Sequence, residues 1–356
     1  MSVTNVAYVV NMFPKLSETF IANEIAALVR RGVTCRVLSL KAPTETLRHP
    51  VVRTLPLDEM LFFDEAAFRR SLADAPPDVV HAHFATEPTR VARAIAADLD
   101  LPYTFTAHGY DVYRRPPADL AARVRDAAAV VTVSDANAAH LVEACGADRA
   151  RLHVLPCGVD LDRFVPMPAR VEPATIVCVA RLRPVKNLGV LLHACRILKD
   201  RGLAARTVVI GEGPSLADLE ALRATLDLVH EVSFEGAQDQ AVVCDWWQRA
   251  TAGVLTSESE GMPVSLMEAA ACGVPAVAPA VGGIPELIAH GETGFVTAPN
   301  APEAIAAGLA RILTEPALRA RMSQAARIRA KARFSSARQV DTLLSLWAPL
   351  VRAVVA

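Results

Sequence analysis

The segment Thr256–Val296 contains more residues that could do chemistry than any other stretch of this 356-residue chain. Glu260 falls in a polar loop, and Glu268, eight positions later, falls in an Ala- and Leu-rich stretch that predicts a helix beginning after Pro263. A second helix is expected to begin just after Gly282-Gly283. Helix N-termini carry unpaired N–H groups and the positive end of the dipole, so this edge favours an anionic ligand. The glutamate spacing alone fits equally well a capping or surface Glu260 and a solvated Glu268.

Two cationic residues, Arg181 and Lys186, precede a predicted helix earlier in the second half of the chain. A strand is expected to end at Ala180 and a helix to begin near Asn187, so Arg181 and Lys186 bracket the loop between them. Fixed cations beside helix N–H groups can neutralise a diphosphate without a metal ion. The alternative is that both are ordinary solvated side chains, as most arginines and lysines are.

A Gly-x-Gly pair, Gly211 and Gly213, follows the next predicted strand and would let backbone approach a nucleotide closely. A single Gly-x-Gly motif is weak evidence for a dinucleotide site. Phe234 ends the strand after it.

His108 and Asp111 follow a strand in the first half, as His-Gly-x-Asp. This arrangement places an imidazole and a carboxylate at a strand end, and we expect Asp111 to orient the loop. His81 and His83 alternate on a strand; no third ligand stands at metal-site spacing, which favours a structural role over a metal pair.

The segment Lys15–Thr19 follows the first strand and opens the first helix. Ser17 is a plausible N-cap, and Glu18 and Thr19 could simply support the helix start. Contact of Lys15, Ser17, Glu18 and Thr19 with a substrate is the competing interpretation.

Short apolar runs alternate with helical patterns in both halves, which is typical of parallel, doubly wound α/β sheets. The expected strands are 6–10, 35–40, 79–83, 104–106, 130–133, 153–155, 175–179, 208–210, 232–234, 254–256 and 274–278. The expected helices include 17–31, 87–97 and 135–144 early in the chain, with Ser134 as an N-cap, and 302–313, 316–331 and 336–351 at its end. The proline-rich 165–173 is the best linker. We therefore predict a domain over 1–165, a second over 174–335 and a C-terminal helix over 336–356.

Composition excludes several classes of protein. The chain is 52% hydrophobic and 21% charged, which indicates a globular protein, and its net charge of −1 argues against electrostatic capture of nucleic acid. Seven scattered cysteines without a metal-binding spacing indicate reduced thiols and a cytoplasmic location. We expect neither a signal peptide nor a membrane span.

Together these motifs resemble the retaining glycosyltransferases of family 4, of the exopolysaccharide and colanic acid type, over nearly the whole length. The resemblance implies an α/β fold of the GT-B type, in which two Rossmann-like domains face each other across a cleft and the last helix crosses back to the first domain. It implies a nucleotide-sugar donor, UDP- or GDP-linked, and a metal-independent reaction without cofactor. Asp98-Leu99-Asp100 and Asp160-Leu161-Asp162 spell D-x-D, but each falls at a turn where aspartates are common.

The resemblance also assigns roles to residues. His108 and Glu260 would contact the donor sugar, Arg181 and Lys186 would grip the diphosphate, and Glu268 would bind the ribose. The remaining donor-side residues would be Gly211, Gly213, Phe234, Gly261, Met262, Pro263, Val264, Gly282 and Gly283, and the acceptor side would include Lys15, Ser17, Glu18, Thr19 and Asp111.

The acceptor implied is a lipid-linked oligosaccharide, with peripheral membrane contact through residues 110–125. That surface would be formed by Tyr113, Arg114, Arg115, Arg123 and Arg125, although a solvated loop and helix fit the pattern equally well. Two alternatives remain: a transferase acting on a small soluble acceptor, and a non-catalytic nucleotide-binding or scaffold protein. A scaffold would be expected to lose donor-site charges, and Arg181, Lys186, Glu260 and Glu268 are all present.

Overall fold

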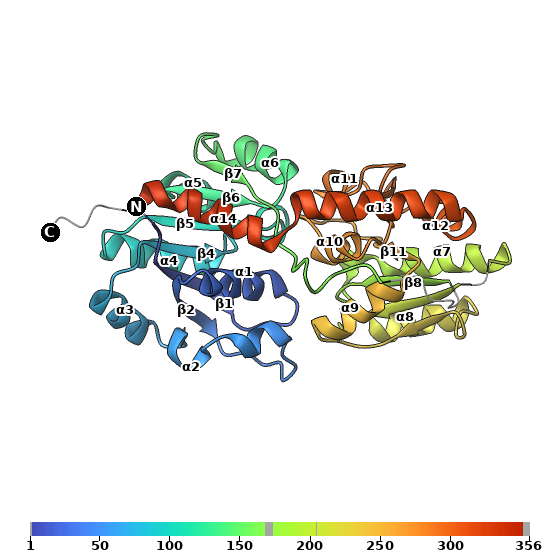
Figure 1. Cartoon of the computed structure of the whole chain (residues 1–356), viewed down its shortest axis with the longest axis horizontal. Coiled ribbons are helices and arrows are strands. Elements are labelled where there is room, and N and C mark those ends of the chain that lie inside the picture. Colours follow the sequence, from blue (N-terminus) through green and yellow to red (C-terminus); the bar gives the residue numbers. More distant parts are fainter. Residues whose placement is uncertain (1, 168–173, 204, 352–356) are drawn as a thin grey trace. The chain divides into compact units, whose positions relative to one another are not determined.

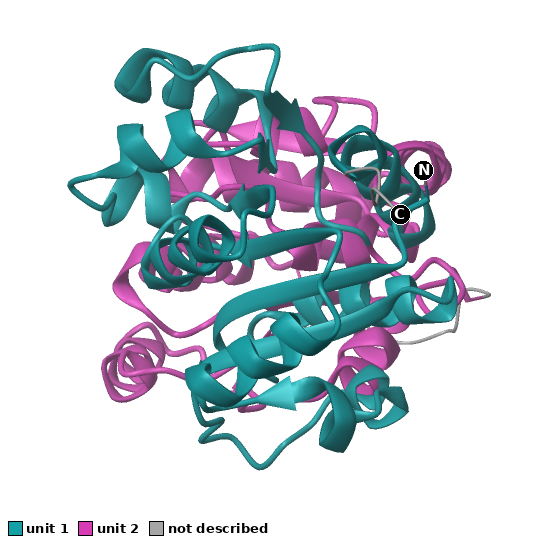
Figure 2. Cartoon of the chain, turned by 90° about the vertical axis from the view of Figure 1, so that its left-hand side faces the viewer, with its two compact units in different colours: residues 1–158, 336–356 teal, residues 159–335 magenta. Residues whose placement is uncertain are grey.

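The computed structural model describes residues 2–167, 174–203 and 205–351 (Figure 1). The chain divides into two compact units: unit 1 comprises residues 1–158 and 336–356, and unit 2 comprises residues 159–335 (Figure 2). Each unit is described below by itself.

Unit 1 is built on a seven-stranded parallel sheet with the strand order β3-β2-β1-β4-β5-β6-β7. Its strands are β1 (Asn5–Met12), β2 (Thr34–Lys41), β3 (Leu61–Phe62), β4 (Val79–His83), β5 (Tyr103–Ala107), β6 (Ala129–Thr132) and β7 (Leu152–Val154). Its helices are α1 (Thr19–Arg30), α2 (Leu57–Met60), α3 (Glu65–Asp74), α4 (Glu87–Asp98), α5 (Leu120–Asp126), α6 (Asp135–Cys145) and α14 (Ser336–Trp347). Single turns η1 (Pro50–Thr54), η2 (Tyr110–Arg114) and η4 (Ala348–Leu350) complete it.

Both faces of this sheet are buried, as expected for a parallel sheet. Side chains of β1 alternate between the two: Val6, Tyr8 and Val10 belong to one apolar cluster, and Ala7 and Val9 to the other. Successive side chains in the middle of β1 therefore pack into two different apolar cores, one on each face of the sheet.

The last helix, α14, packs beside the first, α1, on one of these faces. Val340, Leu343 and Trp347 are fully buried there. Burial of an aliphatic side chain of this size stabilises by about 2 kcal/mol, so the C-terminal helix is an integral part of unit 1.

Unit 2 has a six-stranded parallel sheet with the order β10-β9-β8-β11-β12-β13. Its strands are β8 (Thr175–Val179), β9 (Arg206–Ile210), β10 (Val232–Phe234), β11 (Ala252–Val254), β12 (Ala276–Pro279) and β13 (Gly294–Thr297). Its helices are α7 (Leu188–Asp200), α8 (Leu216–Thr225), α9 (Gln240–Arg249), α10 (Val264–Ala271), α11 (Ile284–Leu287), α12 (Pro302–Thr314) and α13 (Pro316–Arg333), with one turn of 3₁₀-helix, η3 (Pro184–Lys186).

The division between the units falls at Gly158 and Val159 instead of after Val165. Val159 pairs with Ser335, so the outgoing and the returning chain lie side by side at this point. Of the predicted linker, Val165–Met167 belongs to unit 2, and 168–173 lies outside the described residues.

Candidate active site

In unit 2 the predicted donor-side residues come after the carboxyl ends of four neighbouring strands, β8, β9, β11 and β12, except Phe234, which is the last residue of β10. The strand order reverses between β8 and β11, and ligands of open parallel sheets bind at such a switch point. Arg181 and Lys186 follow β8, and Glu260 lies in the loop after β11. The sequence-predicted cations and carboxylate therefore belong to the two loops that flank the switch point.

Lys186 and Glu260 meet directly: the ammonium Nζ of Lys186 is paired with the Oε1 atom of Glu260. Ser257 donates its hydroxyl hydrogen to the same carboxylate oxygen at 2.6 Å. The two loops are also joined through backbone, because the N–H of Glu258 donates to the carbonyl of Val185 at 2.9 Å. Thr256 donates to the carbonyl of Lys186 at 3.1 Å. Hydrogen bonds between the loop after β8 and the loop after β11 therefore hold Lys186 and Glu260 in place.

Gly282 lies against the backbone of Glu260. Its φ is +50°, and a Cβ atom at this position would lie 1.7 Å from the Glu260 carbonyl oxygen. Gly283 donates its N–H to the carbonyl of Gly261 at 2.8 Å. Only glycine fits at Gly282, because both the backbone angle and the space exclude a side chain.

The second predicted helix start differs from the expectation. Helix α11 is a single turn, Ile284–Leu287, and the N–H groups of Gly283 and Ile284 donate to Gly261 and Val281. The prediction that this start offers free N–H groups is therefore wrong. At the start of α10, by contrast, the N–H groups of Val264 and Ser265 have no acceptor within the part of the chain that the structure describes.

Gly211 and Gly213 bring one loop against another. A Cβ atom on Gly211 would lie 2.0 Å from the carbonyl oxygen of Ala180, and one on Gly213 would lie 2.3 Å from that of Leu182. Leu182 in turn donates its N–H to Glu212 at 2.8 Å. These glycines pack the loop after β9 onto the loop that carries Arg181.

The other predicted donor-side residues vary in exposure. Arg181 is exposed, and its guanidinium has no hydrogen bond or ion pair with any described residue. Met262 and Pro263 are buried ahead of α10, and Phe234 is half-buried under the guanidinium of Arg223, 5.4 Å from its ring centre.

Glu268 lies inside α10 and is buried. Its Oε1 atom accepts a hydrogen bond from the Gln240 amide at 3.1 Å. Burial raises the pKa of Glu268 from 4.5 to about 7. The structure thus places this carboxyl in an apolar setting where it titrates near neutrality.

In unit 1, His108 follows β5 and is held by its own loop. The carboxylate of Asp111 accepts the N–H groups of His108 at 3.0 Å, Gly109 at 2.8 Å and Ala85 at 2.7 Å. Burial raises the pKa of Asp111, and these three N–H donors partly oppose the rise. The expectation that Asp111 orients the loop is confirmed, and its completely buried side chain is committed to this task.

The imidazole of His108 packs against two phenyl rings that also contact each other. The ring centre of Phe20 lies 4.6 Å away and that of Phe84 lies 4.5 Å away. The Nε2 atom of His108 lies 3.0 Å from Nδ1 of His83. Burial, followed by the neighbouring His83, lowers the pKa of His108 well below 6.5. Sequence reasoning missed Phe20 and Phe84, which read as ordinary core residues.

His83 continues into a buried polar cluster. Its Nε2 atom lies 3.1 Å from Oε1 of Glu24, and the Tyr8 hydroxyl donates to the same oxygen at 2.7 Å. Among the described residues, Glu24, His81 and His83 alone form a set of three close enough to hold a metal ion. The argument that no third ligand accompanies the two histidines is therefore wrong, because Glu24 arrives from α1.

Hydrogen bonds account for this cluster without a metal. Both ring nitrogens of His81 are bonded to threonine hydroxyls, Thr104 at 2.8 Å and Thr106 at 3.0 Å. Burial lowers the pKa of His81 well below 6.5. A neutral, hydrogen-bonded His81 is consistent with the structural role expected from the sequence.

The loop before α1 is held by other contacts than the predicted Ser17 cap. Helix α1 begins at Thr19 after Glu18, no side chain caps it, and Ser17 is exposed in a turn, so the N-cap prediction for Ser17 is wrong. Lys15 is paired with Glu18. The backbone of Leu16 is held by Glu45 at 2.6 Å and His49 at 2.7 Å, neither of which the sequence had suggested.

The predicted membrane-facing surface is smaller than expected. Arg123 is buried, donates to backbone carbonyls of Ala85 and Thr86 and pairs with Asp119, so it is not a surface cation. Tyr113 stacks against His140, with ring centres 4.5 Å apart. Arg114, Arg115 and Arg125 remain exposed, together with Tyr110. No helix in the described ranges is long and apolar enough to cross a bilayer.

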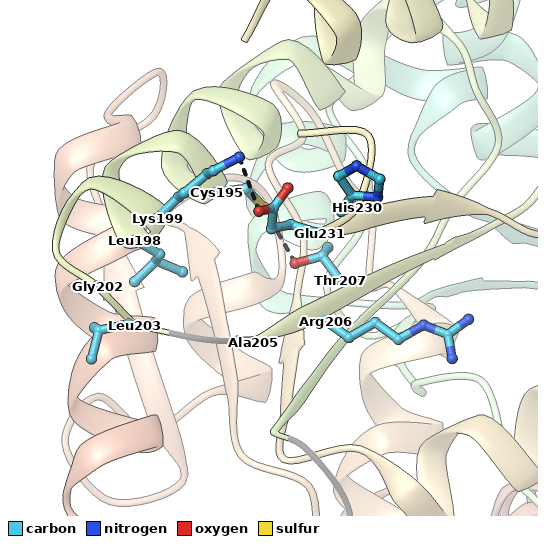
Figure 3. Close-up of a pocket in the computed structure, with 10 residues that line it drawn as sticks. All are labelled: Cys195, Leu198, Lys199, Gly202, Leu203, Ala205, Arg206, Thr207, His230 and Glu231. Carbon is cyan, nitrogen blue, oxygen red and sulfur yellow. Dashed lines mark hydrogen bonds and ion pairs between the residues drawn. The ribbon is translucent and has the colours of Figure 1, made fainter. Parts of the chain in front are cut away.

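A cavity of about 400 Å³ lies elsewhere in unit 2 (Figure 3). Arg206 and Thr207, which begin β9, and Glu231, just before β10, line it. It therefore opens at the amino ends of the strands, away from the loops that carry Arg181 and Glu260, and we do not assign it to the active site. The seven cysteines are free thiols.

Two family models match adjoining parts of the chain. Glycosyltransferase Family 4 matches residues 17–163, and Glycosyl transferases group 1 matches residues 164–329. The chain belongs to the family 4 glycosyltransferases. The matches meet near the division between the units, so each family model corresponds to one Rossmann-like sheet.

Known relatives of this glycosyltransferase differ in what they are named for. A D-inositol 3-phosphate glycosyltransferase of Frankia alni is 29% identical over 86% of this chain and 87% of the relative. WcaL of Escherichia coli K12, named for colanic acid biosynthesis, is 29% identical over 84% of this chain and 88% of the relative. Alr3699/HepE of Anabaena, solved in complex with UDP-glucose, superposes with a TM-score of 0.76 at 17% identity, covering 97% of this chain and 99% of that one. The fold is accordingly GT-B.

Proposed function

We propose that this glycosyltransferase moves a sugar from a UDP- or GDP-linked donor to a hydroxyl of a lipid-linked oligosaccharide, with retention of the anomeric configuration. The observation that carries the proposal is the Lys186–Glu260 pair at the switch point of unit 2, with the exposed Arg181 in the same loop as Lys186. A cation and a carboxylate held together there suit the two ends of a nucleotide-sugar, its diphosphate and its sugar hydroxyls. The UDP-glucose complex of Alr3699/HepE supports a donor of this class.

The chemistry divides among these residues as follows. The bond between the anomeric carbon and the diphosphate oxygen breaks, the acceptor oxygen bonds to that carbon, and the acceptor proton passes to the departing phosphate oxygen. Negative charge grows on the diphosphate, so Arg181, Lys186 and the free N–H groups at the start of α10 stabilise the transition state without reorganising. Glu260 positions sugar hydroxyls, and Glu268 binds the ribose. No step of this scheme requires a metal ion.

The remaining roles also belong to the proposal. His108 contacts the donor sugar near the reacting carbon, and the Lys15–Thr19 loop faces the acceptor. A lipid-linked acceptor would bring the protein to a membrane surface, where Tyr110, Arg114, Arg115 and Arg125 provide an exposed aromatic ring and cations. The similarity to WcaL supports this acceptor class.

A small soluble acceptor is the second candidate. The relative from Frankia alni, named for D-inositol 3-phosphate, favours it. The two acceptors differ in size and in their need for a membrane, so one assay can separate them.

Donor binding is tested first, by the melting shift that UDP, GDP, ADP and their sugar conjugates produce in metal-free buffer. A ligand that binds only the folded state raises the melting temperature, and the rise grows with the ratio of ligand concentration to Kd. One nucleotide should stabilise the wild type and fail to stabilise Lys186→Ala. If no nucleotide stabilises the wild type, the nucleotide-sugar assignment is wrong.

Acceptor choice is then tested with the identified donor, by offering a lipid-linked oligosaccharide in anionic vesicles and an inositol phosphate in solution. Transfer to the lipid-linked glycan supports the first candidate, and transfer to the inositol phosphate supports the second. The anomeric configuration of the product, read by NMR, decides between retention and inversion.

A further inference from the structure

A continuous line of hydrogen bonds leads from backbone near the unit boundary to the ring of His108. Its members come from distant parts of the chain: Gly158, Gln339 of α14, Glu24 of α1, His83 at the end of β4, and His108 after β5. All five belong to unit 1. Because each group can donate or accept only in certain ways, the direction of every bond can be followed along the line.

The first bond has only one direction. The N–H of Gly158 can only donate, so the atom of Gln339 that it meets at 2.8 Å is the amide oxygen Oε1. This fixes the orientation of the Gln339 amide. Its Nε2 atom therefore donates to Oε2 of Glu24 at 2.8 Å.

The carboxylate then determines the form of His83. Both oxygens of Glu24 accept hydrogen bonds, Oε1 from the Tyr8 hydroxyl at 2.7 Å and Oε2 from the Gln339 amide at 2.8 Å, so we assign the hydrogen between Glu24 and His83, at 3.1 Å, to Nε2 of His83. When the ring carries this one hydrogen, its other nitrogen, Nδ1, has only a lone pair. Because Nδ1 of His83 faces Nε2 of His108 at 3.0 Å, that hydrogen belongs to His108.

The last ring is left with one unused atom. His108 in this form has a bare Nδ1 lone pair, and no residue that the structure describes bonds to it. The ring is half-buried, and Phe20 and Phe84 pack against it. Low solvation and a fixed hydrogen therefore produce an oriented acceptor.

We propose that Glu24 and His83 are positioning residues that hold His108 in its Nε2–H form, so that Nδ1 of His108 accepts a hydrogen bond from a hydroxyl of the bound sugar. The part concerning the sugar rests on the proposed function, whereas the tautomer is a property of the protein alone. Nothing in the sequence pattern suggests Glu24, which falls on the buried face of α1.

The substitution Glu24→Gln tests the direction of the line with almost no change of shape. Gln339 still presents an N–H to this side chain, so the new amide turns its oxygen toward Gln339 and its NH₂ group toward His83. His83 must then accept at Nε2 and donate from Nδ1, which reverses the form of His108 to Nδ1–H. The variant converts the acceptor into a donor.

The measurement is the nitrogen chemical-shift pattern of the histidine rings in the full-length protein labelled with ¹⁵N-histidine. The chain has nine histidines, and His108→Asn assigns the signals of His108 by their loss. We expect the Nε2–H form in the wild type and the Nδ1–H form in Glu24→Gln. A wild-type Nδ1–H form, or an unchanged form in Glu24→Gln, overturns the proposal.

Activity provides the second readout. With the donor identified, Glu24→Gln should lower kcat by on the order of 10²-fold, the loss typical of one misplaced hydrogen-bonding group in an active site. Nucleotide binding by unit 2 should be unchanged. A reversed tautomer with unchanged kcat overturns the contact with sugar.

Two comparisons keep these readouts separate from folding and from the proposed function. Tyr103→Phe removes a buried hydroxyl of the same unit, which donates to the carbonyl of Arg123 at 2.6 Å, and should destabilise without changing the His108 form. If Tyr103→Phe changes the tautomer of His108 as Glu24→Gln does, the effect is not specific to this line of hydrogen bonds, and the proposal is overturned. Failure of the proposed function appears instead as absent nucleotide binding, with the tautomers still readable.

Discussion

The ammonium of Lys186 pairs with the carboxylate of Glu260 across 74 positions of sequence, and the two residues belong to loops on either side of a strand-order reversal. Both side chains are largely buried, at 15% and 10% exposure. Removing one partner of such a pair leaves the other charge poorly solvated, so each residue matters to the other as well as to a ligand.

Lys186→Ala should abolish donor binding and lower kcat by roughly 10²- to 10³-fold, because the diphosphate loses its positive partner as charge develops. Turnover and the nucleotide-dependent melting shift in metal-free buffer measure both effects. Lys199→Ala is the matched control, since Lys199 is paired at the surface with Asp227 and Glu231. Equal losses in both variants would contradict a specific role for Lys186.

Gly282→Ala should disrupt the donor site by displacing the loop that carries Glu260. Gly291→Ala is its control, because Gly291 also has a positive φ of +79° but has nothing within 4 Å of a Cβ atom. The control should cost roughly 1–2 kcal/mol of folding free energy from backbone strain alone. Gly282→Ala should cost more and should also lose nucleotide binding. Equal unfolding free energies would show that the close contact with Glu260 is unimportant.

Glu268→Gln should change the pH dependence of stability. The folded protein raises the pKa of Glu268 from 4.5 to about 7, so the folded state holds this proton more tightly than the unfolded state. Wild-type stability is therefore lost as pH rises through this range. Relative to the wild type, the glutamine variant should gain about 2 kcal/mol between pH 5.5 and pH 8.5. Urea unfolding at both pH values measures the gain, and a constant difference would argue against the raised pKa.

His108→Asn should make the protein less sensitive to acid. The pKa of His108 is lowered in the folded state by burial and by His83, while Asp111 faces its backbone and Glu24 lies beyond His83. Below pH 6.5 the unfolded chain binds a proton that the folded state rejects, so stability falls as pH falls. The wild type should lose about 1.4 kcal/mol per pH unit more than the variant. Parallel pH profiles would contradict the lowered pKa.

Local patterns in the sequence were sufficient for most of the fold. Ser134 was confirmed as an N-cap, with its hydroxyl oxygen accepting from the N–H of Asn137 at 3.2 Å. The strand prediction at 175–179 agrees with β8 to the residue. Missing from the prediction were β3 and β13, of two and four residues, which are too short for an alternating pattern to stand out.

The site was predictable only in part, for a physical reason. Lys186 and Glu260 belong to recognisable motifs, and each follows the carboxyl end of a predicted parallel strand. The sequence could therefore place both at the same edge of the sheet. Glu24, His83 and Gln339 could not, because they meet through three separate elements, and Gln339 lies 315 positions after Glu24. Ser17 failed as a cap since the turn before α1 is held by Glu45 and His49 instead, in a loop with no regular pattern.

The place of α14 has a consequence for how the protein is made. A ribosome releases the chain from its first residue onward, so the seven strands of unit 1 emerge long before the helix that covers Tyr8 and α1. Until Val340, Leu343 and Trp347 arrive, that apolar surface is open to water, whereas all of unit 2 has already been synthesised. Synthesis therefore completes the second sheet before helix α14 leaves the ribosome and closes the domain that was begun first.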